Sequence, residues 1–112
     1  MDIDKQLLKG SMKMIVLHII SSSPCHGYEI SSRITKLSDK SFSISEGTLY
    51  PLLHSLQADS YISASQEQIG GRKKKVYRLT SKGKKLLNEK KKEWNTFSSV
   101  MDSVIASLVI RE

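Results

Sequence analysis

The sequence predicts a mainly α-helical protein with one small β-hairpin and a long C-terminal helix. Apolar residues recur at helical spacing in three short segments and in one long terminal segment. Two segments of alternating character flank the pair Gly70-Gly71, which is typical of a hairpin. The chain has 112 residues, the length of one domain, and its 38% hydrophobic content is sufficient for a small core.

The first two helices follow from apolar spacing and from the residues that end them. Apolar side chains repeat at helical spacing from Met12 to Ile20, and Ser22-Ser23-Pro24 ends that helix. A second helix is expected over 28–37, with Ile30, Ile34 and Leu37 on its apolar face.

A third helix is predicted by a leucine stripe. The stripe has i, i+3, i+4, i+7 spacing and consists of Leu49, Leu52, Leu53 and Leu56. Two N-caps fit, namely Ser43 in a capping box with Glu46, or Ser45. Because the stripe runs past Pro51, that proline is expected to bend this helix without breaking it.

A hairpin follows the third helix. Residues 61–65 and 76–79 are predicted as its two strands, and residues 66–75 as a basic tip with Gly70-Gly71 as the turn. Three short helices followed by a hairpin predict a winged helix-turn-helix.

The last helix is expected to begin after Thr80 as its N-cap and to reach the end of the chain. From Trp94 the apolar steps are 3, 4, 3, 4, which is a coiled-coil seam. We therefore predict that residues 1–80 form a DNA-binding domain and residues 81–112 a dimerisation helix, together in one compact unit. The helix stripe is Leu87, Trp94, Phe97, Met101, Val104 and Leu108, and all but Leu87 are predicted dimerisation residues.

Positive charge is concentrated in one stretch. The chain carries 18 Lys and Arg against 11 Asp and Glu, a net charge of +7. Between Gly70 and Lys92 there are 11 basic residues and one acid, Glu89, so this stretch carries +10 and the remainder −3. Such a patch attracts a polyanion, although the run 90–92 also fits a solvated helix face.

The third helix and the hairpin are the predicted DNA-contacting elements. A helix of this kind can enter the major groove and present its non-core face to base edges. The hairpin tip would reach a flanking phosphate or the minor groove. The predicted DNA-binding residues are Ser45, Glu46, Thr48, Tyr50 and His54 on the helix, and Arg72, Lys73 and Lys74 on the hairpin.

The order and identity of these residues resemble the PadR family of bacterial transcriptional regulators. The resemblance rests on His26-Gly27-Tyr28-Glu29-Ile30, on Gly47-Thr48-Leu49-Tyr50-Pro51-Leu52-Leu53, and on the segment from Gly70 to Gly83, and it extends through Trp94. The resemblance covers nearly the whole chain. Among family members, the chain is similar to the short ones that end in a single helix. The chain departs from the common pattern at Ser60, where Gly is usual.

The resemblance implies a homodimeric repressor that binds an inverted-repeat operator. It implies Thr48 and Tyr50 on the groove helix, Arg72 and Lys73 on the wing, and dimerisation through the last helix together with the N-terminal helix. It also implies, for some members, a cavity at the dimer interface that binds planar aromatic or drug-like molecules beside a residue placed like Trp94. From the residues alone, Trp94 fits either a dimer-seam aromatic or a wall of such a cavity.

Several other classes are not supported by the sequence. No phosphate loop, nucleophile elbow or carboxylate pair is present, so no enzyme activity and no cofactor are expected. No metal site is expected, since Cys25 and His26 have no second ligand pair; the lone thiol could be redox-active if its pKa were lowered. His18 is expected to be a partly buried helix residue. Without a membrane span, signal peptide or disulfide, the expected location is the cytoplasm.

Two other functions fit the same chain. One is a small-molecule sensor, in the manner of a multidrug sensor, whose main role is ligand binding at Trp94. The other is a protein-interaction module that uses its last helix as a coiled coil.

Overall fold

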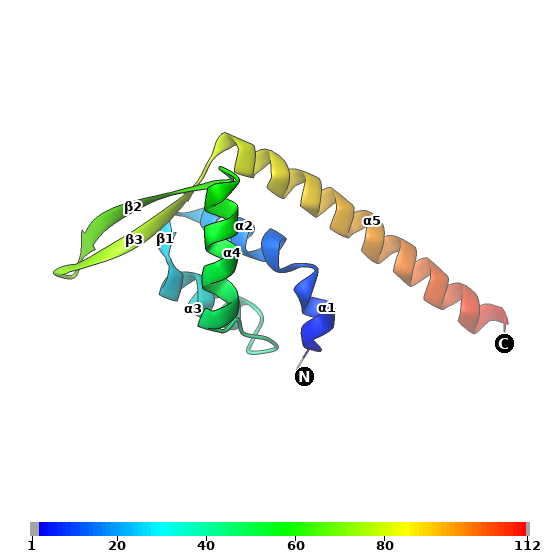
Figure 1. Ribbon diagram of the computed structural model, residues 1–112. Coiled ribbons are helices and arrows are strands. Elements are labelled where there is room, and N and C mark those ends of the chain that lie inside the picture. Colours follow the sequence, from blue (N-terminus) through cyan, green and yellow to red (C-terminus); the bar gives the residue numbers. More distant parts are fainter. Residues whose placement is uncertain (1–2, 112) are drawn as a thin grey trace.

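A computed structural model describes residues 3–111, with side chains through residue 107. Helices α2 to α4 form a compact head from which a two-stranded arm and the long helix α5 project in different directions (Figure 1). The predicted fold class is confirmed. The elements are α1 (Lys5–Lys9), α2 (Met12–Ser22), β1 (Cys25–His26), α3 (Gly27–Leu37), α4 (Glu46–Ala58), β2 (Ile62–Ile69), β3 (Arg72–Leu79) and α5 (Ser81–Arg111).

The core lies where α2, α3 and α4 meet the base of the sheet. Its largest fully buried side chain is Tyr77 of β3, and Leu87 joins the first part of α5 to it. Burial of each large apolar side chain contributes roughly 1.5–3 kcal/mol, so the head depends on these contacts. The helical members are Val16, Leu17, Ile19, Ile20, Ile30, Ile34, Leu49, Leu53 and Leu56.

Two short elements were not predicted. Helix α1 has five residues, too few to show a helical period, and begins where Asp4 accepts a hydrogen bond from the Gln6 N–H at 2.8 Å. Strand β1 has two residues and pairs antiparallel with β3, so the sheet order is β1-β3-β2. It ties the start of α3 to the base of the wing.

The N-cap of α4 is one of the two residues that the sequence offered. The N-cap of α4 is Ser45, whose hydroxyl donates to Thr48 Oγ1 at 3.2 Å, and the capping box expected at Ser43 is wrong. A capping box is instead present at α3, between His26 and Glu29. Helix α4 continues unbroken through Pro51, as expected.

The hairpin is longer than predicted. β2 and β3 pair from Ile62–Leu79 to Ile69–Arg72, so residues 66–69 and 72–75 belong to the strands, and the prediction that both strands end before this tip is wrong. Only Gly70 and Gly71 form the turn, and both have positive φ, +60° and +78°, as a two-residue hairpin turn requires. The outer half of this arm projects from the core, so its side chains lack the alternating burial that identifies a strand.

Helix α5 begins where predicted, because Thr80 Oγ1 accepts a hydrogen bond from the Gly83 N–H at 3.0 Å. The C-terminal part of α5 projects away from the head (Figure 1). The side chain of Leu108 lies outside the described residues. Within residues 3–111, no helix is both long and apolar enough to cross a membrane. The exposed apolar side chains of α5 are Trp94, Phe97, Val100, Met101, Val104 and Ile105.

Candidate nucleic-acid interface

Helix α4 buries one side and exposes the other. Its leucines at 49, 53 and 56 are buried in the core. Opposite them lies a polar face that is free of core contacts, as needed for a helix that enters a groove. All five helix residues predicted to contact DNA are exposed, namely Ser45, Glu46, Thr48, Tyr50 and His54.

The exposed face of α4 has two flanks. Tyr50 and His54 are one turn apart and line a cleft toward β3. Thr48 and Leu52 are also one turn apart and line a hollow toward the junction of α1 and α2. Two residues of separation in an α-helix turn a side chain by about 160° the short way around, so Thr48 and Tyr50 are on nearly opposite flanks.

The cleft beside Tyr50 joins the helix to the wing. Its volume is about 420 Å³, and it lies between α4, the start of α3 and β3. Two of its residues, Tyr28 and Lys75, were not predicted as contacts, although both belong to motifs that the sequence displays. The lining residues are His26, Gly27, Tyr28, Tyr50, His54, Lys74, Lys75 and Tyr77.

The basic residues of the wing lie on the strand that borders this cleft. Arg72, Lys73 and Lys75 are exposed and Lys74 is half-buried. The Lys75 ammonium lies 5.6 Å from the centre of the Tyr77 ring. Among the described residues, no carboxylate forms an ion pair with any residue from 72 to 75. Their charge is therefore available to a polyanion.

Arg78, in contrast, is engaged at the base of the wing. Its guanidinium donates to Glu67 Oε2 at 2.6 Å and to the Ser65 hydroxyl at 2.9 Å. Hydrogen bonds from Arg78 and from Ser65 lower the pKa of the Glu67 carboxyl. This cross-strand network pairs one acid with one base, so the free charge is concentrated at residues 72–75.

Cys25 is not an activated thiol. It is buried, and burial, with a further contribution from Glu29, raises its pKa to about 11. The redox role considered for it needs a lowered pKa and is wrong. Over the described part of the chain, no cluster of three or more His, Cys, Asp or Glu side chains could hold a metal ion.

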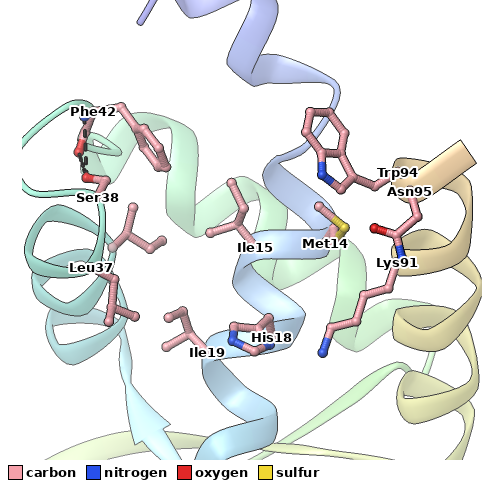
Figure 2. Close-up of a pocket in the computed structure, with 11 residues that line it drawn as sticks. Met14, Ile15, His18, Ile19, Leu37, Ser38, Phe42, Lys91, Trp94 and Asn95 are labelled. Carbon is pink, nitrogen blue, oxygen red and sulfur yellow. Dashed lines mark hydrogen bonds between the residues drawn. The ribbon is translucent and has the colours of Figure 1, made fainter. Parts of the chain in front are cut away.

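A second cavity, of about 580 Å³, separates α5 from α2 and α3 (Figure 2). Trp94 and Lys91 of α5 line one side, and Leu37 and Phe42 line the other. His18 also lines it and is exposed, so its expected partial burial is wrong: the helix face that carries it looks toward the cavity and not the core. The Trp94 and Phe97 rings lie 6.1 Å apart along α5.

Three helices, a hairpin wing and an exposed helix beside a basic strand define the winged helix-turn-helix class of proteins. Comparison with known families makes the assignment narrower. Residues 16–89 match the model of the transcriptional regulator PadR-like family, and the chain belongs to that family.

Individual relatives agree with this assignment. The chain is 32% identical over 85 residues to a transcriptional regulator, Rv3488, of Mycobacterium tuberculosis, a match that covers 76% of this chain and 77% of that protein. The crystal structure of a PadR-like transcriptional regulator from Bacillus cereus has 33% identity and a TM-score of 0.80, and the match covers 90% and 97% of the two chains. A transcriptional regulator from Clostridium thermocellum has 27% identity and a TM-score of 0.83 over 88% and 97%.

Proposed function

We propose that the chain is a non-enzymatic transcriptional repressor that acts as a homodimer on an inverted-repeat operator. The observation that carries this proposal is the cleft in which Tyr50 and His54 of α4 meet Lys74 and Lys75 of β3. Helix α4, which is narrow enough for the major groove, and the basic strand β3 can then contact the same DNA duplex. Membership in a family of transcriptional regulators supports the same function.

The two elements have different roles in this proposal. Helix α4 enters the major groove, where its exposed polar side chains contact base edges. The wing residues Arg72, Lys73 and Lys74 contact phosphates, which fix orientation and supply much of the affinity. The residues assigned to base contact are Ser45, Glu46, Thr48, Tyr50 and His54.

Dimerisation is assigned to residues 81–112, and DNA binding to residues 1–80. Trp94, Phe97, Met101 and Val104 are 41–53% exposed along one seam of α5. Large exposed apolar side chains at heptad spacing are typical of a helix that pairs with a partner. A second copy would cover this seam and place two α4 helices on one duplex.

A salt titration of duplex binding tests the proposal. If a dimer engages about 6 to 8 phosphates, log K falls with log salt at a slope of about −5 to −7. A gel-shift series with that slope is expected. Absence of duplex binding, or binding indifferent to salt, would reject the function.

Two single variants test the assigned roles. Tyr50→Ala should weaken the operator more than random DNA, whereas Lys73→Ala should weaken both by a similar factor. Lys84→Ala, on the exposed start of α5, removes the same charge as Lys73→Ala and serves as its control. Equal losses from Tyr50→Ala on both DNAs would contradict base contact by this side chain.

A second candidate function, release by an aromatic or drug-like ligand, is supported by the cavity beside Trp94. Its mainly apolar lining suits a planar aromatic molecule, with His18 and Lys91 as polar groups. Titration with planar aromatic dyes should quench the single tryptophan and stabilise the protein by mass action. No quenching across such a panel would exclude a sensor of planar aromatic molecules.

The oligomeric state tests the remaining alternative. A chain that is monomeric at micromolar concentration would exclude both the homodimer and a coiled-coil interaction module.

A further inference from the structure

The flank of α4 that faces away from the wing borders a second basic hollow. It has a volume of about 340 Å³ and lies where α1 passes into α2, beside α4 and α5. Three lysines from three different helices line it: Lys9 of α1, Lys13 of α2 and Lys90 of α5. The other lining residues are Gly10, Met12, Thr48 and Leu52.

The charge of this hollow is largely uncompensated. Lys90 Nζ lies 3.3 Å from Glu93 Oε1, and the Glu93 side chain is exposed. Over the part of the chain that the structure describes, neither Lys9 nor Lys13 has a carboxylate partner. Three lysines and one glutamate leave a charge of +2. Gathering like charges in one place is unfavourable unless a polyanion is bound there.

The position of the hollow indicates which polyanion it would bind. Thr48 lines it, whereas Tyr50 lines the cleft beside the wing. An α-helix with its side chains is about 10–12 Å across, and the major groove is about 12 Å wide. When α4 lies in the groove, each flank therefore adjoins one of the two backbones that border it.

We infer that Lys9, Lys13 and Lys90 bind the sugar–phosphate backbone on the side of the major groove opposite the wing. This inference rests on the proposed function, because it requires α4 in the groove. Lysine binds phosphate as a point charge and carries no base recognition. The hollow therefore adds affinity and sets the depth of α4, and the choice of sequence remains with the helix.

The test compares two triple variants of equal charge in the full-length chain. One is Lys9→Gln, Lys13→Gln, Lys90→Gln, and its control is Lys84→Gln, Lys85→Gln, Lys92→Gln on exposed positions of α5. For the first variant, the slope of log K against log salt should become shallower by about 0.9 for each lost phosphate contact, on operator and random duplex alike. The control should keep the wild-type slope. The charge-preserving variant Lys9→Arg, Lys13→Arg, Lys90→Arg should keep it as well.

A second measurement locates the contacts on the DNA. Neutral methylphosphonates are placed one at a time along each strand of the operator. Methylphosphonates on the backbone opposite the wing should weaken binding by the wild type. They should not further weaken binding by the Lys9→Gln, Lys13→Gln, Lys90→Gln variant.

The inference is overturned if that variant keeps the wild-type slope, or if the control loses as much. In either case the wild type still binds duplex with a steep salt dependence, and the proposed function stands. Failure of the wild type to bind any duplex would instead remove the proposed function and this inference with it. Circular dichroism melting of each variant checks that the fold is kept.

Discussion

The ring of Tyr50 lies directly against the backbone of Gly27. A Cβ added at Gly27 would come within 2.7 Å of the Tyr50 hydroxyl oxygen and within 3.0 Å of two ring carbons. Gly27 is the first residue of α3 and is buried, whereas Tyr50 is 38% exposed on α4. Because Gly27 of α3 has no side chain, the Tyr50 ring of α4 can lie at this place in the cleft proposed to contact DNA.

Gly27→Ala should reduce operator binding with little change in stability. The atoms that the added Cβ would contact belong to the far end of the Tyr50 side chain, which can rotate away. We therefore expect the free energy of unfolding to change by less than about 1 kcal/mol. The displaced ring should lose the same specific affinity that Tyr50→Ala loses. A double-mutant cycle by gel shift checks this, since Gly27→Ala should add nothing in the Tyr50→Ala background. A full additional loss there would show that Gly27 acts independently of Tyr50.

Gly83→Ala should destabilise the protein, although alanine normally favours a helix. The added Cβ would come within 2.0 Å of the backbone carbonyl oxygen of Tyr61, which cannot move as a side chain can. We expect a loss of about 1–3 kcal/mol or more in urea unfolding. Gly47→Ala is the control, because an added Cβ there meets nothing within 4 Å. Equal stability of the two variants would contradict this close approach of α5 to the wing.

Ser60→Gly should stabilise the protein. Ser60 has φ +64° and follows the C-cap of α4, where its N–H donates to Gln57 O at 3.0 Å and the Tyr61 N–H donates to Leu56 O at 2.9 Å. This is a Schellman motif, in which glycine is the usual residue at the left-handed position. Removing the strained Cβ should contribute about 0.5–1 kcal/mol to the free energy of unfolding. Ser60→Ala keeps the Cβ and should show no such gain in thermal melts; a gain there would point to another cause.

Alkaline pH should destabilise the fold through Cys25. Its pKa rises from 9.0 to about 11 on folding, so the unfolded chain releases the thiol proton first as pH increases. Stability from this group is constant below pH 9 and falls between pH 9 and 11, by about 2–3 kcal/mol at the upper end. Urea unfolding across this range should show a steeper loss for the wild type than for Cys25→Ala. Parallel curves for the two proteins would contradict a buried, protonated thiol.

Local patterns in the sequence predicted most of the fold. The leucines of α4 face the core and Thr80 caps α5, because helical period and capping depend on residues close in the chain. Elements without a local period were missed: α1 and β1 are too short, and residues 66–75 extend beyond the core that would impose alternation.

The arrangement of the interface was less predictable than its composition. Exposed polar positions on α4 and the basic strand could be named from the sequence, but the contact of Gly27 with Tyr50 joins residues 23 positions apart, and that of Gly83 with Tyr61 joins residues 22 apart. Neither glycine has a positive φ that a turn signal would reveal. Likewise, Lys9, Lys13 and Lys90 become neighbours only through packing of three helices.

Selection of bound duplexes from a random pool shows whether two copies of this chain read DNA together through their α4 helices. The selected duplexes should be enriched in a palindrome whose half-site centres are separated by about one helical turn or a multiple of it, as two α4 helices of a dimer require. Binding to that palindrome should weaken steeply as salt increases. Recovery of no common sequence, or of a single asymmetric site bound by one chain, would contradict a dimeric regulator that reads DNA through α4.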